Sequence, residues 1–167
     1  GDDAAQRLRA MPESSYDAGR YEHGWNAREI LAHIAAIEWT YARLVDLALD
    51  APPAANEPPA EARRTPPEAS PSLPSRPARG GIDDYNARQV EKRARAAVSE
   101  LIDEFVANRA RTIAAVEAMD DALASKPIRS AGGVTGGLAS VIYSIAIDHV
   151  MSHVGDITGE PWRGGRP

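Results

Sequence analysis

Residues 26–48 read NAREILAHIAAIEWTYARLVDLA, and this stretch carries a clear helical signal. Asn26 can cap the first turn, and Glu29, three residues later, can bond back to the cap in a capping box. Trp25 and Ile30 flank the cap with the spacing of a hydrophobic staple. Apolar positions then recur at steps of three and four residues, as Ile30, His33, Ile37, Tyr41, Leu44 and Ala48. We therefore expect a helix whose buried face includes His33.

Working outward, two more stretches show helical periodicity on either side of this one, and no convincing strand alternation competes with them. Residues 3–11 form a short one that Pro12 closes. A longer one starts near Asp83 or Asp84 and runs to about Asp121, and over such a length we expect a bend or a frayed first turn. Its near-heptad stripe suits bundle packing and consists of Ala94, Val98, Leu101, Phe105, Asn108, Thr112, Val116 and Met119.

The last helical stretch follows residues 132–137, a Gly-rich segment that we expect to be a flexible loop. Gly159 and Pro161 end this helix. Its stripe is Leu138, Ile142, Ile145, His149, His153 and Asp156. With four helical stretches and no strands, the sequence predicts an all-α protein built as a four-helix bundle.

Nine of the 13 prolines fall in residues 51–81, between the second and third helices. Such a composition forms neither a helix nor a core. We expect a long Pro-rich crossover there, partly polyproline-like or disordered, that could act as a flap over one end of the bundle.

Length and charge narrow the classes of protein further. A chain of 167 residues is long enough for one domain with a substantial core, and we expect a single domain over residues 1–167. The net charge of −5 and the lack of a basic block disfavour nucleic-acid binding. The sequence has no run of 18 apolar residues, no signal-peptide pattern at its start and no cysteine. We expect no membrane association and a cytoplasmic location.

Histidine is rare here, with four in the chain, and two of them lie one helical turn apart as His149 and His153. Imidazoles at positions i and i+4 share one helix face, about 6 Å apart at Cβ. His33 lies about 10 Å into its own helix, and the midpoint of the pair lies at a similar depth from Gly159. If these two helices are antiparallel, all three imidazoles meet at one level of the core.

Three imidazoles that meet in this way could hold a divalent metal ion. Three protein ligands leave at least one coordination position open, as in catalytic or ligand-binding sites. Zn²⁺ is the first expectation, with Ni²⁺ or Fe²⁺ as alternatives, because imidazole suits all three. A bound water would have a lowered pKa, or a thiolate could take the open position. The competing interpretation is that the histidines are hydrogen-bonded core residues.

Other residues near this site have two interpretations each. Asp156 could orient a ligand imidazole or be a solvated residue at the helix end. The Gly-rich loop could bind an anion, but it lacks the phosphate-loop spacing and a flexible connection explains it better. Asn108 and Arg109 could reach the pocket or merely interrupt the packing, and His23 lies off every stripe and is expected in solvent.

These residues also resemble a known family, the DinB-like superfamily, which includes the N-terminal domains of mycothiol-dependent maleylpyruvate isomerases. Three segments carry the resemblance: Gly24-Trp25 followed by Arg28-Glu29-Ile30-Leu31-Ala32-His33, then Asp84-Tyr85-Asn86-Ala87-Arg88-Gln89-Val90, and His149-x-x-x-His153-Val154-Gly155-Asp156-Ile157. The resemblance implies a four-helix bundle in up-down-down-up order, with a long crossover after the second helix. It implies a metal triad of His33, His149 and His153, although the isomerases have Glu at the position of His149.

The resemblance further implies metal-assisted transfer or isomerisation with a low-molecular-weight thiol such as mycothiol or bacillithiol, and a homodimer through the outer bundle face. Three hypotheses stay open at this point. The first is a metal-dependent enzyme that acts on a small-molecule substrate with a thiol or metal-bound water. The second is a non-catalytic metal-binding stress-response or interaction module, and the third is a metal-free oligomeric bundle.

Overall fold

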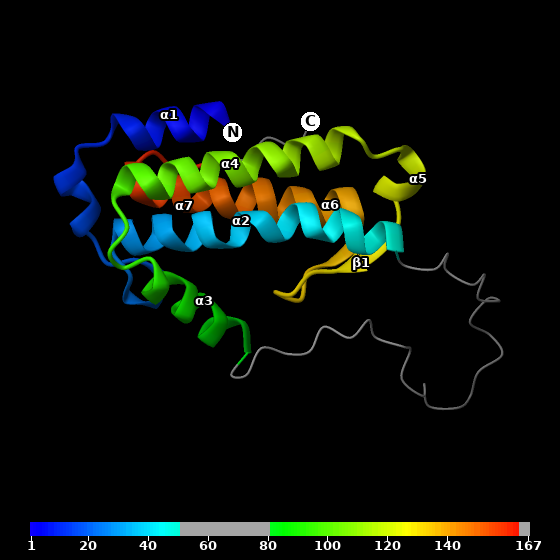
Figure 1. Cartoon of the computed structure of the whole chain (residues 1–167), viewed down its shortest axis with the longest axis horizontal. Coiled ribbons are helices and arrows are strands. Elements are labelled where there is room, and N and C mark those ends of the chain that lie inside the picture. The colour runs from blue at the N-terminus through cyan, green and yellow to red at the C-terminus, as the bar shows by residue number, and fades with distance from the viewer. Residues whose placement is uncertain (51–80, 164–167) are drawn as a thin grey trace.

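The structure is a computed structural model that describes residues 1–50 and 81–163, and these residues are predominantly helical. Figure 1 shows two long helices, α2 (Ala27–Asp50) and α4 (Val98–Glu117), beside a third rod. That rod consists of α6 (Leu138–Ile142), the π-helical turn η4 (Tyr143–Asp148) and α7 (His149–Thr158). The predicted all-α class is confirmed.

The start of α2 follows directly from its sequence. The Glu29 amide donates to Asn26 Oδ1 at 2.9 Å, and the Asn26 amide donates to Glu29 Oε2 at 2.8 Å. The predicted capping box is therefore confirmed. The whole predicted stripe is buried, namely Ile30, His33, Ile37, Tyr41, Leu44 and Ala48.

The hydrogen bonds between helices give their relative directions. Asn108 Nδ2 donates to Ala35 O at 3.4 Å, and Thr112 Oγ1 donates to Glu38 O at 3.4 Å, so residue numbers rise together along α2 and α4. These two helices are parallel. The α6–α7 rod runs opposite to α2, with α7 beside the amino-terminal half of α2 (Figure 1).

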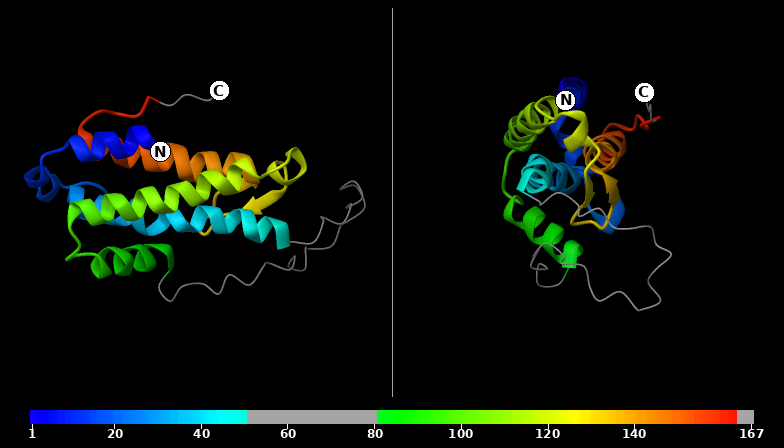
Figure 2. Two further views of the ribbon diagram at one scale, coloured as in Figure 1. Left: turned by 45° about the horizontal axis from the view of Figure 1, so that its top comes forward. Right: turned by 90° about the vertical axis from the view of Figure 1, so that its right-hand side faces the viewer.

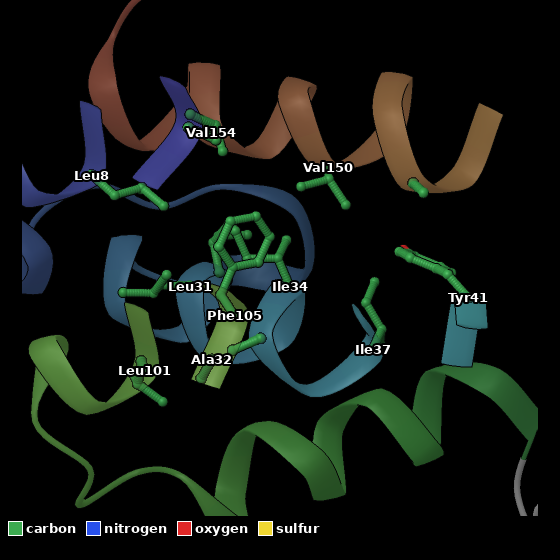
Figure 3. Close-up of a cluster of buried hydrophobic side chains, with 14 of the residues drawn as sticks. Leu8, Leu31, Ala32, Ile34, Ile37, Tyr41, Leu101, Phe105, Val150 and Val154 are labelled. Carbon is green, nitrogen blue, oxygen red and sulfur yellow. The ribbon is translucent and has the colours of Figure 1, made fainter. Parts of the chain in front are cut away.

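The first helix, α1 (Asp2–Ala10), lies against α4 and α7 rather than beside α2 (Figure 2). Arg9 Nη2 donates to Asp103 Oδ1 at 2.8 Å, and Arg7 Nη2 donates to Thr158 Oγ1 at 3.0 Å. Figure 3 shows side chains from these helices pointing into one cluster around Phe105. Its labelled members include Leu8, Leu31, Ile34, Leu101, Val150 and Val154.

The helix predicted from Asp83 or Asp84 to Asp121 is wrong as a single element. The structure has α3 (Gly81–Lys92), a turn, and then α4, followed by the short α5 (Asp121–Ala124). A new helix starts because the Ala97 amide donates to Glu100 Oε2 at 2.8 Å. Arg93 Nε also donates to Glu104 Oε2 across the break, at 2.9 Å. The predicted stripe is buried from Val98 to Thr112, but Ala94 and Val116 are exposed and its last residue, Met119, is only partly buried.

The Gly-rich loop is part of a hairpin that the sequence did not predict. Strands β1 (Pro127–Arg129) and β2 (Thr135–Gly137) pair antiparallel, with Ile128 opposite Gly136. Gly133 occupies a φ of +86° in the turn, which a side chain would disfavour. Strands of three residues, one of them rich in glycine, show no alternating pattern in the sequence. They form because each pairs with the other.

The stripe predicted for the last helix is displaced by the π turn. Leu138, Ile142 and His153 are buried as expected, but Ile145 and His149 are only partly buried, and Asp156 is exposed. Within η4 and after it, the buried apolar positions are Ala146, Val150, Val154 and Ile157. The centre of the buried face therefore moves by about one residue, as expected for a π turn within an α-helix.

No helix in residues 1–50 and 81–163 is long and apolar enough to cross a membrane. The predicted Pro-rich crossover at residues 51–81 lies outside the described residues, apart from Gly81 at the start of α3.

Candidate metal centre

The structure brings together the three histidines that the sequence singled out. His33 lies in the second turn of α2, and His149 and His153 lie in the first two turns of α7. One nitrogen from each ring belongs to a set in which all atoms lie within 4.8 Å of one another. His33 and the His149–His153 pair, which lie at similar depths from opposite ends of their helices, are thus at one level of the core.

His149 and His153 face each other with their Nε2 atoms 3.0 Å apart. Their ring centroids are 4.6 Å apart, and the rings are inclined by 68°. His33 meets both rings edge-on, with centroid distances of 5.7 Å to His149 and 5.4 Å to His153. Ring nitrogens carried by two helices therefore lie in one small volume.

His33 is strongly perturbed by its buried surroundings. Its side chain is 4% exposed, and its Nδ1 has no hydrogen-bond partner among the described residues. Burial, and after it the proximity of His153, His149 and His23, lowers the pKa of His33 to about 3. The ring is therefore neutral at physiological pH, which is the form that binds a metal ion.

Asp156 lies one helical turn beyond His153 and faces its outer nitrogen. The Asp156 Oδ2 atom is 3.3 Å from His153 Nδ1, and the carboxylate is partly open to solvent. A carboxylate at this position favours the tautomer with a proton on Nδ1, which leaves the Nε2 lone pair free for a cation. This geometry is compatible with the orienting role suggested for Asp156, which stays a prediction.

Trp25 and His23 continue the aromatic cluster outward, which the sequence did not indicate. The Trp25 ring lies 5.2 Å from the His33 ring, and the His23 ring lies 4.9 Å from Trp25, measured between centroids. His23 is exposed, as expected, and has a φ of +60°. Only the chain path between residues 18 and 27, where Ala27 N donates to Ala18 O at 3.2 Å, brings these rings beside His33.

A second buried polar group lies one level further along the bundle. Glu38 Oε2 is 2.9 Å from Arg109 Nη2, and the two side chains are 0% and 8% exposed. Burial raises the pKa of Glu38 to about 7, although the Arg109 charge opposes the shift. The buried Glu38 was not predicted from the sequence. The signal that could have indicated it is a lone acidic residue beside the apolar stripe of α2. Among the described residues, the Asn108 side chain donates to Ala35 O, and the Arg109 side chain donates to Ala146 O and pairs with Glu38, so neither residue is seen to bond to a histidine.

The donors of the cluster suit a divalent metal ion of the borderline class. All three are imidazoles, two of them are buried, and one carries a buried nitrogen without a partner. Buried polar atoms are rarely left unsatisfied, and three imidazole ligands satisfy the preferences of Zn²⁺, Ni²⁺ or Fe²⁺. The residues present therefore fit a metal ion.

A family model for the DinB superfamily matches residues 1–157. The chain belongs to the DinB superfamily. The match covers all three histidines and nearly all of the described helices, so the expected resemblance is confirmed. No curated protein and no solved structure matches this DinB superfamily member significantly.

Proposed function

We propose that this DinB superfamily protein binds one divalent metal ion through His33, His149 and His153, and that it is an enzyme whose reaction depends on this ion. The observation that carries the proposal is the convergence of three imidazole nitrogens within 4.8 Å of one another in the core. Zn²⁺ is the first candidate for the ion, with Ni²⁺ or Fe²⁺ as alternatives.

The chain's own residues would prepare the site before any ion arrives. His33 is held neutral by burial, and so it needs no deprotonation to act as a ligand. Asp156 would orient His153 through Nδ1, and α2 and α7 would fix the angle between the ligands. An ion with three protein ligands would supply an open position, where it would lower the pKa of a water or a thiol.

The proposed reaction class is transfer or isomerisation with a low-molecular-weight thiol, such as mycothiol or bacillithiol, or with water as the nucleophile. Because residues 1–50 and 81–163 contain no cysteine, any thiol must come from outside this part of the chain. The partner would therefore be a small-molecule substrate or thiol. The remaining expectations belong to the same proposal: a single domain, an up-down-down-up bundle with a Pro-rich crossover after α2, a homodimer and a cytoplasmic location.

The burial of the site supports a second candidate function. His33 and His153 are each only 4% exposed, which suits an ion that is enclosed by protein. In that case the protein is a non-catalytic metal-binding module for stress response or interaction, with the ion in a structural or sensing role.

The experiment is to purify the protein without an affinity-metal step and to measure metal identity and stoichiometry. The expected result is one divalent ion per chain, and a metal-free protein would overturn both candidate functions. The loaded protein is then incubated with mycothiol or bacillithiol and the electrophile monochlorobimane. Turnover supports the enzyme, whereas a bound ion without thiol binding or turnover supports the non-catalytic module.

A further inference from the structure

The π turn η4 determines which way His149 and His153 point. It ends at Asp148, directly before His149, and the His149 amide itself donates to Ser144 O, five residues back. An α-helix rotates by about 100° per residue, and a π turn accommodates about one residue more than an α turn. Without η4, the side chains of α7 would therefore be rotated by a large angle relative to α6. The direction of the histidine pair depends on this turn.

Arg109 contacts the π turn from the neighbouring helix α4. Its Nη1 donates to Ala146 O at 2.7 Å, and the bond is buried. Isolated π turns are rare and less favourable than α-helix, so a π turn persists where other contacts favour it. A charged donor on a carbonyl inside the turn is such a contact, because charge-assisted hydrogen bonds are about twice as strong as neutral ones.

Glu38 contacts Arg109 from another helix, α2. Glu38 lies on α2, five residues after His33, and its Oε2 is 2.9 Å from Arg109 Nη2. Together the two side chains link the helix that carries His33 to the turn that orients His149 and His153. They do so through α4, within the hydrophobic core.

A buried ion pair of this kind is weak evidence for stability. Both carboxylate oxygens of Glu38 and the Nε of Arg109 lack an aligned hydrogen bond among the described residues. A buried ion pair with unsatisfied atoms is often no more stable than two apolar side chains of similar size. Such pairs can instead select one packing arrangement among several.

We propose that Arg109, held by Glu38, is a positioning residue of the histidine site. It stabilises the π turn through Ala146 O and thereby sets the rotation of His149 and His153 toward His33. The metal-binding consequence rests on the proposed function, but the effect on the turn does not.

The first test compares the metal affinity of wild type with that of the double variant Glu38→Met/Arg109→Met, which leaves no unpaired charge in the core. Competition with a chromophoric chelator gives Zn²⁺ affinity, and Co²⁺ absorption reports ligand geometry. We expect a folded variant with at least a tenfold loss of affinity and an altered Co²⁺ spectrum. A folded double variant with wild-type affinity and spectrum overturns the proposal.

Two further variants complete the design. Arg93→Met/Glu104→Met removes an ion pair that lies away from the histidines, and it should retain wild-type metal affinity. Arg109→Lys keeps the charge and one donor, and it should recover part of the affinity lost in the double variant. If the double variant does not fold, Arg109→Lys alone is compared with wild type. An unchanged affinity and spectrum in Arg109→Lys then overturns the proposal.

The second test needs no metal and separates this proposal from the proposed function. In chelator-treated protein, hydrogen exchange of the His149 amide reports the bond to Ser144 O. We expect exchange at least tenfold faster in Glu38→Met/Arg109→Met than in wild type or the Arg93/Glu104 control. Unchanged exchange overturns the positioning role even if the protein binds metal. Faster exchange in a protein that binds no metal supports the positioning role and overturns only the metal function.

Discussion

The Nε2 atoms of His149 and His153 lie 3.0 Å apart, one helical turn from each other on α7. Two neutral imidazoles at this distance form a hydrogen bond if one of them carries its proton on Nε2. The same two atoms become neighbouring ligands of a cation if both protons sit on Nδ1. Asp156 favours the second state at His153, because its carboxylate faces Nδ1. A small change of proton position therefore separates a core hydrogen bond from a metal site.

Replacement of a ligand histidine should abolish stoichiometric metal binding. His149→Ala, His153→Ala and His33→Ala each leave two imidazoles, which is too few for a stable site with Zn²⁺. We expect metal content to fall from about one ion per chain to a small fraction of that. Elemental analysis after dialysis measures it, and His23→Ala is the matched control. Equal metal content in all four variants would show that these histidines do not form a metal site.

Asp156→Asn should weaken metal binding without abolishing it. Loss of an orienting carboxylate typically lowers metal affinity by about 10–100-fold, and the partial exposure of Asp156 favours the low end. Chelator competition measures the affinity, with Asp46→Asn on the exposed face of α2 as the control. An affinity equal to that of wild type would mean that Asp156 is a solvated helix-end residue.

The buried His33 should make the metal-free protein less stable in acid. Its pKa is 6.5 when unfolded and about 3 when folded, so only the unfolded state gains a proton between these values. The stability contributed by a neutral His33 is present above pH 6.5 and is lost as the pH falls toward 3. The maximal slope is about 1.4 kcal/mol per pH unit. The stability of wild type relative to His33→Gln, measured by urea unfolding from pH 7 to 4, should therefore fall as the pH falls, because the contribution of Glu38 is common to both proteins and cancels in the difference. His23→Gln should behave as wild type.

Glu38 should have the opposite pH dependence. Burial raises its folded pKa from 4.5 to about 7, so the folded state holds an extra proton between these values. The resulting stability is fully present below pH 4.5 and is lost as the pH rises through 7. Relative to Glu38→Gln, wild type should therefore gain stability as the pH falls from 7.5 to 5, as followed by urea midpoints. The exposed Glu117→Gln serves as control, and a relative loss for wild type over this range would contradict the assignment.

Gly155 should be needed for the C-terminal segment to lie against α7. A Cβ at Gly155 would meet backbone atoms, with Glu160 O at 2.9 Å and Trp162 N at 3.1 Å. Gly155→Ala improves helix propensity by about 1 kcal/mol, but overpacking against backbone costs about 1–3 kcal/mol. We expect a net loss of thermal stability and a red shift of Trp162 fluorescence, since the bond from Trp162 Nε1 to Asp148 is released. Ser152→Ala, on the exposed side of α7, should show neither change.

Local sequence chemistry was sufficient for much of the site. The capping box of Asn26 and Glu29 depends on residues three apart, and the shared face of His149 and His153 depends on residues four apart. Such short-range relationships are encoded wherever a helix forms. The equal depths of His33 and the pair also needed only helix geometry and an antiparallel arrangement. The three candidate ligands could therefore be chosen without tertiary contacts.

Contacts between distant residues decided the rest. No Gly or Pro marks the break between α3 and α4, which is accompanied by bonds to Glu100 and Glu104. The π turn before His149 has no local signature either, and Arg109 reaches its carbonyl from 37 residues away. The paired strands around the Gly-rich turn likewise exist only through each other. A backbone amide can donate to several acceptors, and a backbone carbonyl can accept from several donors. Packing determines which of these partners lies within reach. The sequence alone therefore identifies the three histidines as candidate ligands, and the tertiary structure determines the direction in which they point.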